Sequence, residues 1–460
     1  MIRLIHKFKL DGYNVLLDVN SGGVHLVDDL TYDLLDCVDP PFAPECPEKA
    51  LDKLSKLYPP AEIKECYAEL LEVYRDKILF SDDDYAQYAE KAVLSPVKAM
   101  CLHIAHDCNM RCDYCFASTG DFGVGRKLMD FETGKRAIDF LIEKSFDRKF
   151  LELDFFGGEP LLNFDVVKQI VAYARAREAE VGKVFRFTIT TNGLLLDDDK
   201  IAFINREMSN VVLSIDGRKE INDRMRKRVN GAGTYDKIIK NYKRLVAGRG
   251  DKDYYVRGTY TKYNLDFSED VLHLFEAGFD QISVEPVMTD PAEPYAIGMG
   301  DLAKIFCEYE RLSKKLEQIH TDGGFCNFFH FALDLDQGPC AIKRLRGCGS
   351  GNEYVAITPD GEIYPCHQFV GIEEFKMGSL YDGTFSQEIK KEFATAHVYS
   401  KPDCVKCWAK FYCSGGCNAN NYLYAGDIHS AHKLSCEIQK KRLECAILKR
   451  AVGMLEKERV

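Results

Sequence analysis

Six short apolar segments alternate with helix-length polar stretches between residue 98 and about residue 290, and no other feature restricts the fold as strongly. A strand followed by a helix, repeated six times, predicts a parallel sheet with right-handed crossovers. Six units in about 200 residues indicate a partial (β/α)6 barrel of the α/β class, although an open doubly wound sheet would give the same pattern. In either fold the reactive site lies at the C-terminal ends of the strands. The predicted strands are residues 99–105, 151–156, 184–190, 211–215, 254–260 and 281–287.

Cysteine is frequent, with 18 in 460 residues, and the first residues make a poor secretory signal. No run of 18 apolar residues occurs, so no membrane span is expected. We therefore expect a cytoplasmic protein. In a reducing compartment, clustered cysteines are more often metal ligands or catalytic groups than disulfides.

Negative charge is concentrated near the N-terminus. Residues 1–95 hold 10 Lys and Arg against 19 Asp and Glu, which accounts for −9 of the net charge of −11. The rest of the chain is close to neutral. This distribution disfavours nucleic-acid binding through a basic patch, and it permits a basic peptide partner.

Residues 1–90 predict a small module of strands and helices ahead of the barrel. A Gly-containing hairpin turn joins two apolar strands, and two helix-like stretches follow a Pro-rich loop. The predicted elements are strands at 13–19 and 24–27, helices at 47–57 and 60–79, and a linker at 81–96.

The barrel is placed at residues 96–300 and is followed by a helical bridge at 301–337. Residues 338–460 are rich in Gly and Cys and have few long periodic segments. That composition suits a small domain held by metal sites rather than by a large apolar core. The chain is predicted to end in a helix at 437–457.

Cys108, Cys112 and Cys115 form a C-x3-C-x2-C motif directly after the first predicted strand. Three thiolates can hold three irons of a [4Fe–4S] cluster and leave the fourth iron open for a catalytic ligand. Tyr114, just before the third cysteine, offers an aromatic packing surface. The alternative is a structural zinc knuckle with a distant fourth ligand.

This motif, at the start of a six-unit βα series, strongly resembles the radical SAM superfamily. The resemblance implies that the open iron binds S-adenosylmethionine (SAM), and that one-electron reduction releases a 5′-deoxyadenosyl radical that takes hydrogen from the substrate. The ends of the next three strands also resemble family motifs that meet the methionine amine, the ribose and the carboxylate. Taken singly, the motifs of the third and fourth strands are ordinary turn sequences. The implied SAM-binding residues are Tyr114, Gly157, Gly158, Glu159, Thr190, Asn192, Ser214 and Arg226.

The C-terminal cysteines follow a longer pattern: C-x12-G-x4-C, a gap, C-x2-C-x5-C-x3-C, a gap, and C. The pattern resembles the SPASM extension of radical SAM enzymes, which binds two auxiliary [4Fe–4S] clusters and would bring the total to three. The alternative is two structural zinc sites. By resemblance, Cys348, Cys366 and Cys417 hold the first auxiliary cluster. Cys340 either completes it or leaves a position open for a substrate thiolate. The second would be held by Cys404, Cys407, Cys413 and Cys436.

The order of elements in residues 1–90 resembles the winged-helix-like recognition element of enzymes that modify ribosomally made peptides. Such elements bind a precursor's leader as an added edge strand, and they hold the core peptide at high effective concentration. A structural N-terminal cap is the simpler alternative. The acidic balance predicts a leader with some Lys or Arg.

Residues 4–8, 17–22 and 349–359 resemble the maturases of SCIFF peptides. That resemblance implies Cys-to-Thr thioether crosslinks, of the ranthipeptide type, in a Cys-rich precursor peptide, with an electron donor such as ferredoxin or flavodoxin. Two alternatives stay open. One is an anaerobic sulfatase-maturase-like enzyme that oxidises a side chain without crosslinking. The other is a non-enzymatic zinc or electron-transfer protein.

Overall fold

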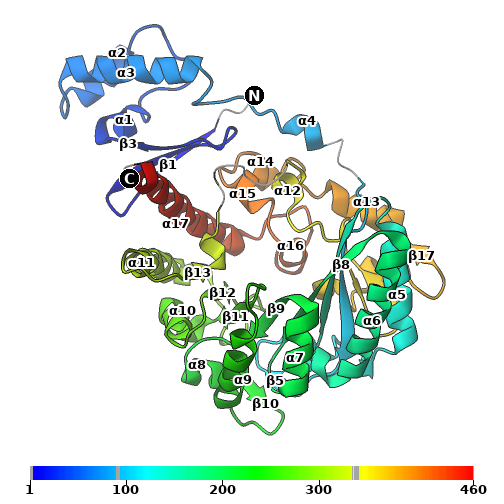
Figure 1. Ribbon diagram of the computed structural model, residues 1–460. Helices are drawn as coiled ribbons and strands as arrows, with labels where there is room; N and C mark the ends of the chain where they lie inside the picture. The colour runs from blue at the N-terminus through cyan, green and yellow to red at the C-terminus, as the bar shows by residue number, and fades with distance from the viewer. Residues whose placement is uncertain (1–3, 90–93, 334, 336–340, 459–460) are drawn as a thin grey trace.

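The structure is a computed structural model that describes residues 4–89, 94–333, 335 and 341–458 (Figure 1). A module formed by residues 4–80 lies at one end of the molecule, and the large sheet with its covering helices lies at the other. The C-terminal helix runs between them.

All six predicted strands are present, and each pairs in parallel with the next one along the chain. A doubly wound sheet would reverse its strand order near the middle, so the sequential order confirms the partial barrel. The strands are β4 (Ala99–His106), β7 (Phe150–Gly157), β8 (Val184–Thr191), β9 (Met208–Ser214), β11 (Tyr255–Tyr260) and β12 (Gln281–Pro286).

The barrel does not close, because other strands pair with both of its edges. β13 (Asn327–Phe328) adds in parallel to β12, and β14 (Tyr354–Ile357) adds in parallel to β4. The Cys-rich region is therefore continuous with the barrel sheet. It extends the sheet further through the antiparallel strands β15 (Glu362–Tyr364), β16 (Gly378–Ser379) and β17 (Thr384–Phe385).

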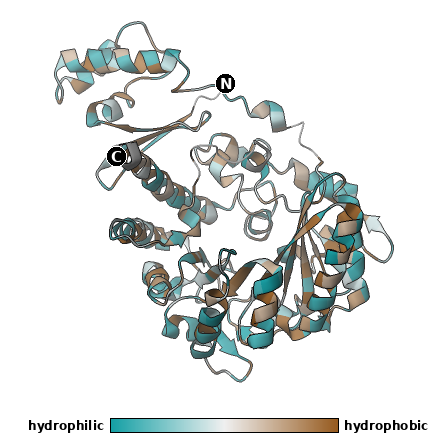
Figure 2. Cartoon of the chain, in the orientation of Figure 1, coloured by the Kyte–Doolittle hydropathy of each residue, from teal (hydrophilic) through white to brown (hydrophobic). Residues whose placement is uncertain are grey.

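Helices cover the outer face of the sheet, and the inner face is buried at β4 but partly exposed from β7 onward. On β7, Leu153 and Phe155 are buried against the helices, whereas Glu152 is exposed and Asp154 is half-buried. Parallel sheets are usually covered on both faces, so a polar inner face indicates a surface kept for a ligand. The helices carry hydrophobic and hydrophilic sides (Figure 2). They are α5 (Phe131–Lys144), α6 (Phe164–Val181), α7 (Asp198–Glu207), α8 (Lys219–Met225), α9 (Tyr235–Ala247), α10 (Phe267–Glu276) and α11 (Leu302–Thr321).

The N-terminal module is a three-stranded antiparallel sheet beneath three helices. One face of the sheet has its own core, in which Leu16 packs with Leu34 and Tyr67. The other face joins the main core of the protein through Val15 and Leu17. The module is therefore anchored to the rest of the chain. Its elements are β1 (Ile5–Leu10), β2 (Tyr13–Asp18), β3 (Val24–Val27), α1 (Asp29–Leu34), α2 (Glu48–Leu54) and α3 (Pro60–Arg75).

The module also contacts the Cys-rich region directly. His6 on β1 stacks flat on Trp408, with ring centroids 3.8 Å apart, and its Nε2 lies 3.1 Å from a Glu444 carboxylate oxygen. The segment predicted as a linker contains the short helix α4 (Ala86–Ala89) and ion-pairs through Asp83 with Lys410 at 2.8 Å. These contacts join the first part of the chain to the last.

The C-terminal region consists of short helices and ends in one long helix, which begins four residues before the predicted start at 437 and packs against α11. No helix among the described residues is long and apolar enough to cross a membrane. The helices are α12 (Ala341–Arg346), α13 (Gln387–Thr395), α14 (Pro402–Val405), α15 (Lys410–Cys413), α16 (Asn418–Ala425) and α17 (Lys433–Glu458).

Candidate functional site

One pocket lies at the C-terminal ends of the first four barrel strands. It brings together every residue predicted for the cluster and SAM site except Glu159. All of them except Arg226 follow or end one of four parallel strands, so the parallel topology gathers them, and Arg226 comes from β10 (Arg226–Arg228). The predicted residues that line the pocket are Cys108, Cys112, Tyr114, Cys115, Gly157, Gly158, Thr190, Asn192, Ser214 and Arg226.

Two glycines let the end of β7 pack on the cysteine loop. Gly157 has a φ of +126°, and a Cβ there would lie 2.3 Å from the carbonyl oxygen of Ala105. A Cβ on Gly158 would lie 2.2 Å from the carbonyl oxygen of Asp107, the residue before Cys108. Only glycine allows both approaches.

Glu159 does not line the pocket itself, but it hydrogen-bonds to residues that do. The buried carboxylate accepts hydrogen bonds from the Thr191 hydroxyl and the Asn192 N–H, both at 2.8 Å, and from the Leu161 N–H at 3.0 Å. Burial raises the pKa of Glu159 to about 7. The carboxylate thus fixes Asn192, which lines the pocket. Its predicted contact with the methionine amine stays a prediction.

Tyr114 and Arg226 belong to a buried polar cluster with Asp216. The Tyr114 hydroxyl lies 2.8 Å from both carboxylate oxygens of Asp216 and accepts a hydrogen bond from Arg226 at 3.0 Å. Burial raises the pKa of Asp216 to about 6, with the Arg226 charge opposing it. Asp216 has no role that its sequence position predicts, because only the fold brings it to Tyr114.

The cysteine loop is held against the pocket by a short ladder. β5 (Met110–Cys112) pairs with β10 (Arg226–Arg228), and the register sets Cys112 opposite Arg226. The Cys108 sulfur accepts hydrogen bonds from the Met110 N–H at 3.4 Å and from the Asn192 side-chain amide at 3.5 Å. Hydrogen bonds to sulfur are one way in which proteins tune iron–sulfur clusters.

The donor set fits a cluster and a cofactor that carries a carboxylate. Burial raises the pKa of Cys108 to about 12 and that of Cys112 to about 11, a cost that iron offsets because it binds the thiolate. The buried Nε of Arg226 has no hydrogen-bond partner among the described residues and can serve a carboxylate. Those residues include no three His, Cys, Asp or Glu side chains placed to hold one metal ion. In a four-iron cluster each thiolate binds a different iron.

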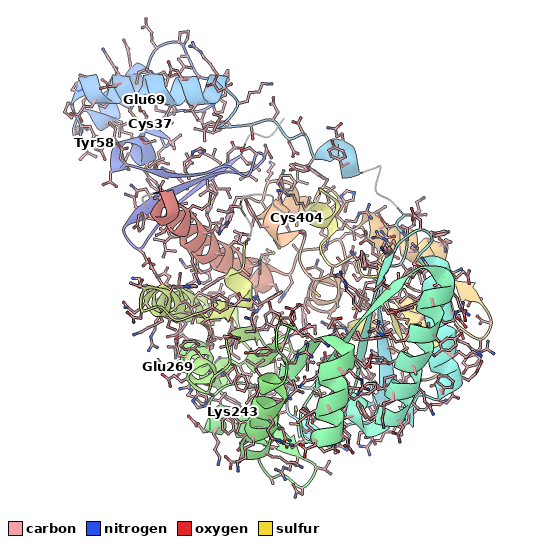
Figure 3. The ribbon with its side chains drawn as sticks, in the orientation of Figure 1. Cys37, Tyr58, Glu69, Lys243, Glu269 and Cys404 are labelled. Carbon is pink, nitrogen blue, oxygen red and sulfur yellow. The ribbon has the colours of Figure 1, made fainter. Side chains whose placement is uncertain are left out.

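The four cysteines predicted for the second auxiliary cluster line a single cavity of about 450 Å³. Burial raises the pKa of three of these thiols to about 11. Figure 3 labels one of them, Cys404, in the region between the N-terminal module and the barrel. The four are Cys404, Cys407, Cys413 and Cys436.

Three cysteines predicted for the first auxiliary cluster are also neighbours. Burial raises the pKa of Cys366 far above its usual value, and the nearby thiols of Cys417 and Cys348 add to the increase. Cys340, the predicted fourth ligand, lies outside the described residues. Whether it binds the cluster therefore stays a prediction.

Known protein families match both the barrel and the C-terminal Cys-rich region. A profile of the radical SAM superfamily matches residues 102–284, and a profile of SPASM, an iron–sulfur cluster-binding domain, matches residues 348–408. The chain thus combines a radical SAM domain with a SPASM domain. These domains imply [4Fe–4S] clusters and bound SAM.

Three known proteins show how far the similarity extends. A cysteine-type anaerobic sulfatase-maturating enzyme from Clostridium novyi is 26% identical over 338 residues, or 68% of this chain and 86% of the relative. The solved structure of anSMEcpe with bound AdoMet is 20% identical, with a TM-score of 0.64, and covers 78% of this chain and 98% of its own. Streptococcus suis SuiB bound to S-adenosylmethionine is 19% identical, with a TM-score of 0.54, and covers 93% and 97%.

Proposed function

We propose that this chain is a radical SAM peptide maturase that installs Cys-to-Thr thioether crosslinks in a ribosomally made, Cys-rich (SCIFF-type) precursor peptide. The observation that carries the proposal is the combination, in one chain, of the strand-end pocket, two further cysteine sets and an N-terminal module whose sheet has β3 as an edge strand. When bound, the pocket's cluster and SAM supply a 5′-deoxyadenosyl radical that removes hydrogen from a substrate carbon.

The extent of the structural similarity supports a peptide substrate with a leader. The anSMEcpe match leaves about a fifth of this chain uncovered, a share similar in size to the N-terminal module, whereas the SuiB match covers 93%. SuiB has also been solved bound to its precursor peptide SuiA. A module beyond the catalytic and cluster-binding parts suits an enzyme that must recognise a leader.

The inner face of the sheet offers a seat for the core peptide. Arg257 on β11 is exposed on this face, next in register to Ser214 of the pocket, and pairs with Glu285 at 3.5 Å. Glu285 in turn is near enough to Cys417 to affect its pKa. A peptide held by Arg257 would therefore lie between the SAM pocket and the first auxiliary cysteines, where a substrate thiol and an acceptor carbon must meet.

Forming a thioether removes two hydrogens: the acceptor carbon loses a hydrogen atom to the 5′-deoxyadenosyl radical, and the Cys thiol loses a proton. As the sulfur–carbon bond forms, one electron is released. We propose that the electron leaves through the auxiliary clusters to a small carrier such as ferredoxin or flavodoxin. In the set predicted for the first auxiliary cluster, Cys348 and Cys417 are exposed.

The proposed function is tested by metal analysis followed by mass spectrometry. Anaerobically purified protein should hold about twelve irons, three clusters of four, with matching sulfide and little zinc. Incubated with reductant, SAM and a synthetic Cys-rich peptide of the SCIFF type that carries its leader, it should give a product lighter by two hydrogens, with one fewer thiol open to alkylation, for each crosslink. A side chain oxidised without a crosslink would favour the sulfatase-maturase alternative, and stoichiometric zinc would contradict the proposal.

Leader recognition is best tested by proline at Leu26, because deleting the module would expose the main core. The N–H of Asp18 donates a hydrogen bond to the carbonyl oxygen of Gly23 at 2.8 Å, which makes these two residues a hydrogen-bonded pair of the β2–β3 ladder. Hydrogen-bonded and non-hydrogen-bonded pairs alternate along an antiparallel ladder, so Leu26 belongs to a non-hydrogen-bonded pair and its N–H points away from β2. Leu26→Pro should therefore block an added strand and leave the module's own ladder intact. Loss of the Leu26 N–H should weaken binding of the same peptide, carrying a fluorescent label, about 10- to 100-fold as measured by fluorescence anisotropy.

The matched control is Leu26→Ala, which shortens the side chain and keeps the N–H. It should bind the peptide within a few-fold of the native chain, and both variants should retain peptide-independent SAM cleavage. Equal loss of binding in both variants would contradict recognition by strand addition at β3.

A further inference from the structure

Lys401 is completely buried between the two C-terminal cysteine sets. Its ammonium donates hydrogen bonds to the Gly415 carbonyl oxygen and to Asn418 Oδ1, both at 2.9 Å. Lysine is almost never fully buried without a partner charge. The position of this one therefore calls for a nearby negative group.

The hydrogen bonds of Lys401 hold the loop that joins the two sets. That loop carries Cys413, predicted for the second auxiliary cluster, and Cys417, predicted for the first. The residues between them have positive φ angles of 60° for Ser414, 85° for Gly415 and 75° for Gly416. Lys401 also stands just before α14, which carries Cys404. One side chain thus touches the backbone that presents both sets.

No carboxylate pairs with Lys401 among the residues that the structure describes. The groups that oppose the effect of burial on its pKa are four thiols: Cys404 and Cys413 from one set, and Cys417 and Cys348 from the other. Lys410 makes a useful contrast. It is equally deep, at 2% exposed, but Asp83 neutralises it at 2.8 Å.

We propose that Lys401 is a shared counter-charge for both auxiliary clusters and raises the reduction potential of each. The inference rests on the proposed function, because it requires that both sets bind clusters. A cluster gains negative charge on reduction, and a cation fixed in a low-dielectric interior stabilises that charge more strongly than one in water. One lysine would in this way keep both clusters ready to accept the electron released by crosslinking.

The test is a redox titration of full-length chains in which Cys108, Cys112 and Cys115 are alanine, so that only auxiliary clusters give signals. Lys401→Gln keeps a hydrogen-bond donor and loses the charge, whereas Lys401→Arg keeps the charge. With iron content unchanged, Lys401→Gln should lower the equilibrium constant for reduction of each cluster at least tenfold. For a one-electron couple this corresponds to a reduction potential lower by about 59 mV. Lys401→Arg should shift it less than about threefold.

Three outcomes would overturn the inference. Unchanged potentials in Lys401→Gln would remove the electrostatic role. A shift in one cluster alone would show that the charge is not shared. Loss of iron from Lys401→Gln but not from Lys401→Arg would make Lys401 a structural clamp. Failure of the proposed function is distinguishable, because the chain with native Lys401 would itself lack about eight auxiliary irons.

Discussion

Replacing Cys112 by alanine will abolish the reductive cleavage of SAM. Cys112 is one of three thiols in the strand-end pocket, and its strand register fixes it opposite Arg226. Changing outer-shell partners of a metal site already costs about 10- to 100-fold, so losing a ligand should cost at least about 1,000-fold. The measurements are 5′-deoxyadenosine formed under reducing conditions and iron per chain, which should fall by about four.

A cysteine outside the three sets provides the control. Cys307 is exposed on α11 and is not among the predicted ligands. Cys307→Ala should keep the native iron content and SAM cleavage within about twofold. Cleavage that survives in Cys112→Ala, with iron unchanged, would mean that this pocket is not the site of radical formation.

The barrel could be predicted because its signal is local. Each of its six strands is a short apolar run between helix-length stretches, and all six occur where the alternation places them. The strands that extend the sheet had no such signal. β13 has two residues and β14 has four, and each becomes a strand only because it pairs with β12 or β4. Pairing between segments distant in sequence leaves no periodicity to detect.

In the candidate site, too, some residues could be predicted from the local sequence and others could not. Gly157, Thr190 and Ser214 could be assigned to one pocket because each ends a predicted parallel strand. The roles of Asp216 and Thr191 could not be assigned, because they depend on contacts 102 residues away at Tyr114 and 32 residues away at Glu159. Sequence motifs thus identified the pocket's lining. The buried groups behind that lining needed the folded structure.

Replacing Gly158 by alanine should disable the pocket without removing any ligand. The new Cβ would lie 2.2 Å from the Asp107 carbonyl oxygen and 2.6 Å from its carbon, and both are backbone atoms that cannot rotate away. Two backbone hydrogen bonds keep β7 close to the cysteine loop. The Gly158 N–H donates to the Ala105 carbonyl oxygen at 2.8 Å, and the Glu159 N–H donates to the Asp107 carbonyl oxygen at 2.9 Å. Relief therefore requires Asp107, and with it Cys108, to shift.

Such overpacking costs about 1–3 kcal/mol of folding free energy, and a displacement near 1 Å in a catalytic site can cost about 100-fold. We therefore expect Gly158→Ala to lose at least about 100-fold in SAM cleavage and to melt a few degrees lower. Gly300→Ala is the matched control, because a Cβ there meets nothing within 4 Å. If Gly158→Ala cleaves SAM within threefold of the native chain, the close approach of β7 to the cysteine loop is not needed for the chemistry. The three thiols would then define the site without a requirement for glycine at position 158.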